Sequence, residues 1–185
     1  MNLLVLVMQD FQDLEIVGVT SIFKKSNMFN NITFYSPQNL NKVCGQFQIA
    51  TIECETKIDL SQYDAIYVPG GKGATILRSN NIGIQTIKHF FDFNKWVLAI
   101  CDAPNAIDES NLLKDDYQYI SWANCLSNNQ KRIKDQNTNL FWSHKFITGR
   151  SSVQTIQFAL YCLHIIFKNA GFNWKEFLKD LSGRF

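Results

Sequence analysis

The 185-residue chain has few chain breakers, with only three prolines and nine glycines, and it has no block of like charges longer than a short pair. Tracts rich in proline, glycine or serine are missing, so nothing indicates a linker or a low-complexity segment. A net charge of +2 gives no electrostatic basis for binding nucleic acid. We interpret residues 1–185 as one domain, because this length suits one full hydrophobic core.

Cysteine pairs of the Cys-x-x-Cys kind are also missing. The cysteines are odd in number and widely spaced, which indicates neither a zinc cluster nor a disulfide framework; they are Cys44, Cys54, Cys101, Cys125 and Cys162. The N-terminal apolar run lacks a basic leader and ends at Gln9, too early for a signal peptide or a membrane span. We therefore expect a protein of the reducing cytoplasm, with no metal and no membrane contact.

Continuous apolar runs alternate with helix-like segments, a pattern typical of a parallel sheet covered by helices on both faces. The predicted fold class is therefore α/β. The runs predict strands over 3–7, 32–35, 64–68, 97–100 and 119–122, a β-ribbon over 43–54 and a hairpin over 140–148. Helices are predicted over 14–26, 74–77, 82–91, 155–168 and 174–181, and residues 107–113 are predicted to finish a short helix.

Cys101 ends the apolar run 97–100, and a helix-like segment begins directly after it. A strand that turns sharply into a helix projects the side chain at the turn above the sheet. The first N–H groups of the helix place partial positive charge near the sulfur, which favours a thiolate. A small buried cysteine at the end of a core strand would give the same local pattern, so the rest of the chain must distinguish the two interpretations.

The loops after neighbouring strands supply further candidates, because the carboxyl ends of strands in a doubly wound sheet meet at one crevice. The loop after the first strand carries Asp10, Asp13 and Glu15. The loop after 64–68 carries Gly70 and Gly71, whose backbone N–H groups can stabilise an oxyanion or bind a carboxylate. We hypothesise that these loops and Cys101 form one nucleophile site.

Three segments in register resemble the ThiJ/PfpI superfamily. Residues 64–71 read Asp-Ala-Ile-Tyr-Val-Pro-Gly-Gly, 99–104 read Ala-Ile-Cys-Asp-Ala-Pro, and 146–150 read Phe-Ile-Thr-Gly-Arg, with Glu15 ahead of all three. The resemblance implies a flavodoxin-like three-layer sandwich with a mainly parallel central sheet, a nucleophile elbow at Cys101 and a homodimer. It also implies a protonated Glu15 hydrogen-bonded to the cysteine, a role that burial would support.

We further expect the backbone amides of Gly70, Gly71 and Asp102 to act as oxyanion donors, and we expect no cofactor. Arg150 and Lys25 match basic positions of the superfamily and are candidates for anion binding, although each also fits an ordinary surface cation. Gln46 stands on the ribbon where the superfamily has a basic residue. Because glutamine carries no charge, we expect weaker anion binding.

Trp122 occupies the place where glyoxalases and deglycases of the superfamily carry a histidine. An indole N–H cannot accept a proton, so it cannot act as the general base. Among the other histidines, His89 and His164 fit packing positions, and His144 in the predicted hairpin turn is the one to test. Asp102 stands where the protease-like branch has histidine, which argues against peptidase activity; its charge would oppose a thiolate unless it is directed away or caps the helix.

Two functions of different classes follow. In the first, Cys101 attacks a small reactive carbonyl compound and Glu15 shuttles a proton, as in a glyoxalase or deglycase with weak or altered activity. In the second, the protein is a redox-sensing or chaperone-like stress protein in which Cys101 is oxidised without turnover. A chain that keeps the fold without the activity is a third alternative. We favour the enzyme.

Overall fold

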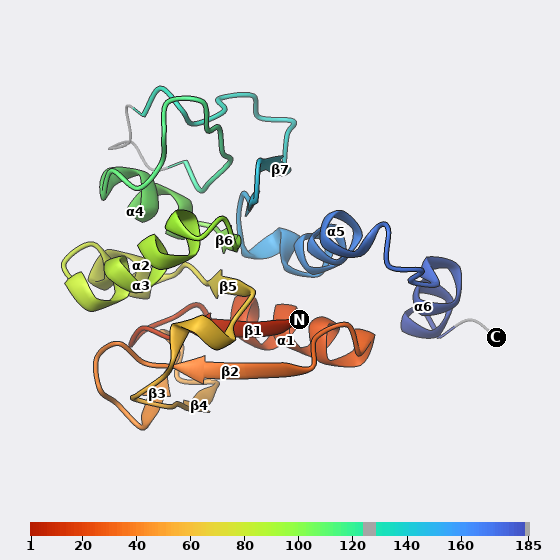
Figure 1. Cartoon of the computed structure of the whole chain (residues 1–185), viewed down its shortest axis with the longest axis horizontal. Coiled ribbons are helices and arrows are strands. Elements are labelled where there is room, and N and C mark those ends of the chain that lie inside the picture. Colours follow the sequence, from red (N-terminus) through yellow and green to blue (C-terminus); the bar gives the residue numbers. More distant parts are fainter. Residues whose placement is uncertain (124–128, 184–185) are drawn as a thin grey trace.

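The computed structural model describes residues 1–123 and 129–183. Its main sheet has the strand order β2-β1-β5-β6-β8-β7 (Figure 1). The strands are β1 (Asn2–Leu6), β2 (Asn31–Tyr35), β5 (Ala65–Val68), β6 (Trp96–Ile100), β7 (Leu140–Ser143) and β8 (Phe146–Gly149). All neighbours pair in parallel except β7 and β8, which form the predicted antiparallel hairpin at one edge.

Helices cover both faces of this sheet (Figure 1). Side chains alternate along β1, so that Leu3 and Val5 enter the core under one layer of helices, whereas Leu4 and Leu6 enter the core under the other. The first layer contains α1 (Asp13–Ser26) and α5 (Thr155–Phe167), and the second contains α2 (Lys72–Leu77), α3 (Asn81–Asp92) and α4 (Ala103–Glu109). The predicted α/β sandwich with a mainly parallel central sheet is confirmed.

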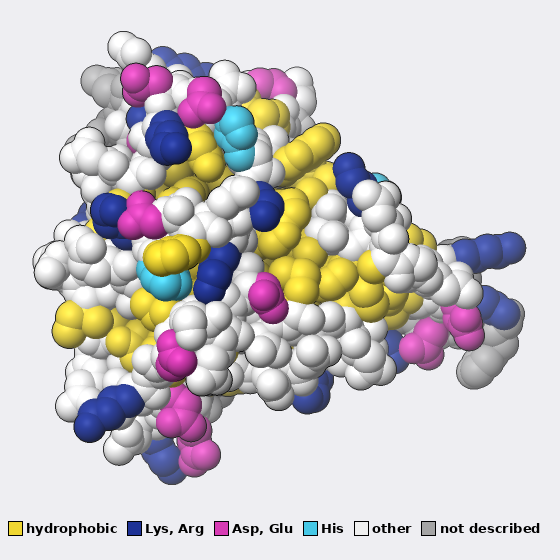
Figure 2. Space-filling view, in the orientation of Figure 1, with side chains coloured by type: hydrophobic (Ala, Val, Ile, Leu, Met, Phe, Trp, Pro, Cys, Tyr) yellow, Lys and Arg dark blue, Asp and Glu magenta, His cyan; other side chains and the backbone are white. Residues whose placement is uncertain are grey.

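Smaller elements complete the fold. The predicted ribbon is present as the antiparallel pair β3 (Lys42–Cys44) and β4 (Thr51–Glu53). The C-terminal helix α6 (Trp174–Leu181) buries Phe177 in the core of α1 and α5. Figure 2 shows hydrophobic side chains gathered beside α5, between the body of the molecule and α6. The 3-10 turn Leu60–Gln62 lies between β4 and β5, and the 3-10 turn Ser152–Gln154 lies between β8 and α5.

Two predicted elements differ from the structure. Residues 119–122 are not a strand, because β8 takes the place beside β6 and leaves Tyr119 only an isolated bridge to Arg132. The helix predicted to follow Cys101 directly and to finish over 107–113 begins at Ala103, as expected, but ends earlier, at Glu109. Asn111 has a φ of +56°, a left-handed conformation that a continuing helix does not accommodate.

The most apolar helix of the chain, α5, has 13 residues. At about 1.5 Å per residue it is shorter than the hydrocarbon core of a bilayer. In the ranges 1–123 and 129–183, no helix combines the length and the apolar character that a membrane span requires.

Candidate active site

Cys101 lies at the turn between β6 and α4, with a φ of +62°. A left-handed conformation is uncommon for any residue but glycine, and neighbours must hold it in place. Here the Cys101 N–H donates to the Gly149 carbonyl at 3.0 Å, and the Cys101 carbonyl accepts from the Trp122 N–H at 2.8 Å. The turn is therefore held from β8 on one side and from the segment after α4 on the other.

Two backbone amides point at the sulfur, those of Gly71 and Asp102. They belong to the N-terminal ends of α2 and α4, so both helices present their positive ends to Cys101. Gly70 allows this close approach, because a Cβ at that position would lie 2.7 Å from the Cβ of Cys101 and 3.0 Å from the Asp102 nitrogen. The Gly71 and Asp102 amides therefore lie beside the sulfur, and their role as oxyanion donors stays a prediction.

Glu15 lies in the first turn of α1 and is fully buried. Its Oε2 accepts a hydrogen bond from the Gly70 N–H at 2.7 Å, and the carboxyl also contacts the Cys101 sulfur. Its second oxygen, Oε1, has no conventional hydrogen bond in the described part of the chain. The role expected for Gly70 is therefore corrected: its amide holds Glu15 and is not free to hold an oxyanion.

The carboxyl and the thiol form one coupled acid–base pair. Burial raises the pKa of Glu15 from 4.5 to about 7, despite the hydrogen bond from Gly70. Burial and the charge of Glu15 also raise the pKa of the Cys101 thiol to about 12, against the opposing effect of the two amides. The positive helix ends favour the predicted thiolate, whereas burial and the Glu15 carboxylate oppose it. The first proton leaves the pair near neutral pH.

The sulfur faces a cavity of about 390 Å³. None of the three histidines of the chain lines it, and Lys72 is the cationic side chain among the residues that do. In the described ranges, no three histidine, cysteine or acidic side chains gather closely enough to hold a metal ion. The lining residues are Gln12, Gln46, Phe47, Gly71, Lys72, Thr75, Cys101, Asp102, Trp122 and Ser152.

The structure places Trp122 at the cavity of Cys101, and its replacement of a histidine stays a prediction. Its side chain is 52% exposed and lines the cavity. His144 lies elsewhere, in the turn of the β7–β8 hairpin, where its Nε2 is 3.1 Å from Asp116 Oδ2 and its ring lies against Tyr117. Neither the indole nor His144 therefore offers a general base beside the sulfur.

Arg150, predicted to bind anions, instead organises a loop. Its Nε and Nη2 donate to the Thr138 carbonyl at 3.0 and 2.7 Å, and Nη2 also donates to the Asp135 carbonyl. It is not among the residues that line the cavity of Cys101. The guanidinium is occupied by backbone acceptors, and the structure does not bring it to the sulfur.

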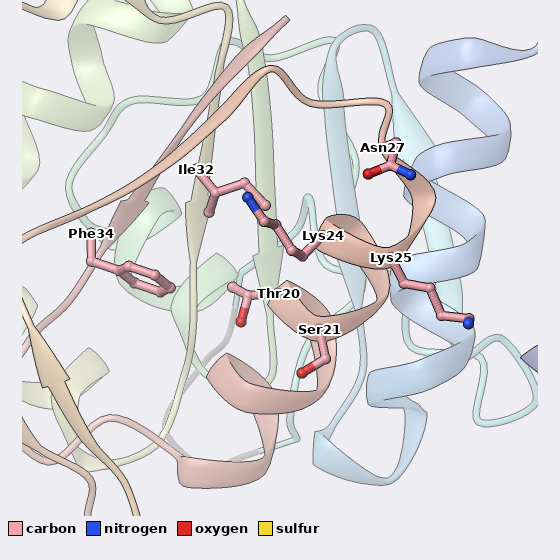
Figure 3. Close-up of a pocket in the computed structure, with 7 residues that line it drawn as sticks. All are labelled: Thr20, Ser21, Lys24, Lys25, Asn27, Ile32 and Phe34. Carbon is pink, nitrogen blue, oxygen red and sulfur yellow. The ribbon is translucent and has the colours of Figure 1, made fainter.

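Lys25 lies near the far end of α1, about 15 Å along the helix from Glu15. Its Nζ is 2.7 Å from Asp180 Oδ2 of α6. Figure 3 shows Lys25 pointing away from Ile32 and Phe34, with which it lines a separate cavity of about 700 Å³ between α1 and β2. Neither of the two cations expected to bind anions therefore lies at Cys101.

Sequence reasoning missed Lys72, Gln12 and Ser152 as cavity residues. Lys72 directly follows the Pro-Gly-Gly turn after β5, at the sheet edge where ligands bind in such folds, and that place was the available signal. Gln12 and Ser152 had none, because they enter the cavity through turns whose geometry the sequence pattern does not specify.

Comparison with known proteins places this geometry in a family. The profile of the DJ-1/PfpI family matches residues 1–165. The chain belongs to the DJ-1/PfpI family. The crystal structure of Drosophila melanogaster DJ-1beta superposes with a TM-score of 0.81 at 17% identity, covering 98% of this chain and 97% of that one. This likeness shows the shared flavodoxin-like fold.

Relatives in the family carry different names. MG029 of Mycoplasma genitalium, an uncharacterized protein, is 28% identical over 163 residues, which is 85% of this chain and 84% of MG029. YraA of Bacillus subtilis, named provisionally as a cysteine protease, is 26% identical over 151 residues, or 80% and 87% of the two chains. Deglycase TK1284 of Thermococcus kodakarensis is 24% identical over 116 residues, or 62% and 68%.

Proposed function

We propose that the protein is a cysteine-dependent enzyme of the glyoxalase or deglycase type, which acts on small reactive carbonyl compounds with weak or altered activity. The observation that carries this proposal is the pairing of Cys101 with a buried Glu15 whose pKa is raised to about 7. The similarity to a relative named as a deglycase supports it. The free state of the four described cysteines fits a reducing cytoplasm; they are Cys44, Cys54, Cys101 and Cys162.

The first chemical step is the addition of the thiol to an aldehyde. The ionised carboxylate of Glu15 takes the thiol proton as the sulfur attacks the carbonyl carbon, and then delivers this proton to the carbonyl oxygen. A carbon–sulfur bond forms while the carbon–oxygen π bond breaks, so a hemithioacetal results with no net change in charge. The amides of Gly71 and Asp102 stabilise negative charge on the sulfur and on the oxygen beside it.

In the second step a base removes the proton bound to the carbon that carries sulfur, and the neighbouring carbonyl carbon gains a proton, so a thioester forms. Water then breaks the carbon–sulfur bond and releases lactate and the Cys101 thiol. With Trp122 at the cavity and no histidine lining it, the carboxylate of Glu15 is the base that faces the reacting atoms. It must therefore serve both steps in turn, which we expect to make turnover slow.

The test is methylglyoxal consumption with detection of lactate. We expect turnover in the wild type, loss in Cys101→Ser and retention in Cys162→Ser, because Cys162 is fully buried on α5 and away from the cavity. Equal activity in the two variants would remove Cys101 from the mechanism. No turnover in the wild type, with activity appearing in Trp122→His, would instead show that the elbow is intact and that the enzyme reading is wrong.

A second function, redox response, is favoured by the missing histidine. Two equivalents of hydrogen peroxide would convert the thiol to a sulfinate and be reduced to water. A protonated Glu15 can donate a hydrogen bond to a sulfinate oxygen, and this role needs no further base. The expected result is a mass gain of two oxygens on Cys101 under mild peroxide, suppressed in Glu15→Leu. Oxidation spread evenly over all five cysteines would contradict it.

The homodimer also stays a proposal, and an exposed apolar rim beside the cavity supports it. We define this apolar rim as Leu14, Val17, Phe47, Ile49, Val153 and Ile156, each between 46% and 85% exposed. Asp13 of α1 holds the ribbon turn through the N–H groups of Phe47 and Ile49, and a Cβ on Gly18 would lie 3.8 Å from Ile156. Since Phe47 also lines the cavity, a second copy on this rim would narrow its mouth.

A further inference from the structure

Arg78, directly after α2, makes a double fork with two carboxylates. Its Nη1 and Nη2 donate to Asp102 Oδ2 and Oδ1 at 2.8 and 3.1 Å, and its Nε donates to Glu109. The side chain of Arg78 is 24% exposed and that of Asp102 is 15% exposed, so this ion pair is mostly withdrawn from water. Planar bidentate pairing of this kind fixes orientation as well as charge.

Asp102 directly follows Cys101, and its backbone N–H and its side-chain carboxylate have different partners. Its N–H points at the sulfur, whereas its carboxylate turns to Arg78 and to the Asn105 Nδ2 at 2.9 Å and does not cap α4. The carboxylate therefore lies close to the reactive pair without entering its chemistry. Its charge acts on Glu15, where it opposes ionisation.

We propose that Arg78 is a positioning residue that sets the reactivity of Cys101: it turns the Asp102 carboxylate away from the sulfur and balances its charge. The inference rests on the proposed role of Cys101 as the reactive group, and it concerns the ease of forming the thiolate rather than the choice of substrate.

The fork also ties together the two amides that face the sulfur. Arg78 closes α2, to whose Ala74 carbonyl its Nη1 donates at 3.0 Å, and α2 begins after Gly71. Asp102 precedes α4. The Arg78 guanidinium therefore connects α2, which follows the Gly71 amide, with Asp102, which supplies the other amide.

Other charged or titratable groups face the reactive pair from each neighbouring element. They are Tyr67 from β5, Lys72 from α2, Glu109 from α4 and Cys162 from α5. Among them Tyr67 donates its hydroxyl hydrogen to the Glu15 carbonyl at 3.0 Å, and burial raises its pKa well above the ordinary value, so that it stays neutral. Lys72 is exposed at the mouth of the cavity. Arg78 is the cation that contacts Asp102 itself.

The test is the rate of Cys101 alkylation by iodoacetamide, followed by mass spectrometry as a function of pH. We expect Arg78→Met to move the pH profile upward and to slow alkylation at neutral pH on the order of tenfold, since a neighbouring like charge shifts a pKa by roughly one unit or more. Asp102→Asn is expected to speed it, and the double variant to return towards the wild-type rate. Lys88→Met, which removes a cation from an exposed ion pair on α3, is the matched control and should leave the profile unchanged.

Each result decides the proposal. An unchanged pH profile in a folded Arg78→Met overturns it. A slow rate of alkylation that the double variant with Asp102→Asn does not restore also overturns it, because that result indicates that Arg78 has only a structural role. If Arg78→Met does not fold, Asp102→Asn alone decides: faster alkylation supports the proposal and equal or slower alkylation overturns it. Alkylation requires no carbonyl turnover, so a protein without glyoxalase activity whose profile shifts as described would refute only the proposed function.

Discussion

At the scale of single residues, the site is defined by two acids in contact, the buried Glu15 carboxyl and the Cys101 thiol, whose ionised forms repel each other. A buried carboxyl that loses its proton near neutral pH can act as an acid on one side of that pH and as a base on the other. The raised pKa lowers the free energy of unfolding, because Glu15 ionises in the unfolded chain without burial of its charge. Function and stability therefore depend on the same proton.

Replacing Glu15 with glutamine should stabilise the protein increasingly as pH rises. The folded pKa of about 7 lies above the ordinary value of 4.5, so the wild type loses stability between these two pH values and stays at the lower level above them. Glutamine does not ionise, and its oxygen can still accept from the Gly70 N–H. We expect the variant's advantage in unfolding free energy to grow by up to about 3 kcal/mol across this window.

Urea unfolding at a series of pH values measures this difference. The matched control is Glu53→Gln, which changes a carboxylate exposed on β4 and should show no comparable trend. A difference between Glu15→Gln and wild type that stays constant with pH would mean that Glu15 is ionised in the folded protein at all these pH values.

Gly70 sets the second residue-scale prediction, because a methyl group there meets the elbow itself. In Gly70→Ala the new Cβ would lie 2.7 Å from the Cβ of Cys101 and 3.0 Å from backbone atoms, and relief requires the turn to move. We expect a loss of about 1–3 kcal/mol in stability and a strong loss of Cys101 alkylation. In Gly171→Ala nothing lies within 4 Å of the new Cβ, but the φ of +69° strains an alanine, so stability falls while alkylation stays unchanged. Unchanged alkylation of Cys101 in Gly70→Ala would contradict the argument.

At the scale of elements, the site depends on how the ribbon of β3 and β4 is fastened to α1. Asp13 is 5% exposed and accepts hydrogen bonds from the N–H groups of Phe47, Ile49 and Ala50 at 2.8 to 3.1 Å. Burial raises the pKa of its carboxyl, but these backbone bonds outweigh burial and lower it below 3.8. The clamp holds Gln46 and Phe47 at the cavity.

Asp13→Asn should loosen this clamp. We expect a loss of about 2 kcal/mol near neutral pH, because three backbone donors lose a charged acceptor. Since the folded pKa is lowered, the stabilisation is complete above 3.8 and is lost as pH falls through the folded pKa, so the two proteins should converge in acid. Thermal unfolding as a function of pH measures this difference, with Asp115→Asn, which changes an exposed carboxylate, as the control. A difference that persists in strong acid would contradict the proposed role of Asp13.

Sequence patterns located most elements and failed where another strand competed for the same place. The apolar runs that form β1, β5 and β6 are fully buried. Because both faces of these strands are buried, they appear in the sequence as continuous apolar runs and can be predicted from it. Residues 119–122 have the same character, yet β8 pairs with β6 instead. Pairing partners depend on the whole sheet, and no local pattern encodes them.

At the scale of the whole molecule, the convergence of loops at one sheet edge could be predicted, but the direction of charged side chains could not. Glu15 and Cys101 meet because the topology brings the ends of β1 and β6 to one side of the sheet. Arg150 and Lys25 turn elsewhere because backbone carbonyls and Asp180 are nearer acceptors. The positions of Lys72 and Arg78 depend on the geometry of α2, which begins directly after the Pro-Gly-Gly turn, and the sequence pattern does not specify that geometry.

The apolar rim gives the prediction that belongs to the whole molecule. If two copies bury it, Val17→Glu places a charge from each chain in the contact, and such uncompensated charges oppose association. We expect sedimentation equilibrium to show a dimer for the wild type and a monomer for Val17→Glu. Ile82→Glu changes a residue that is 58% exposed on α3, in the layer on the opposite face of the sheet, and should remain dimeric. A monomeric wild type at micromolar concentration would mean that this rim serves a different partner, and the mouth of the cavity would then be shaped by this chain alone.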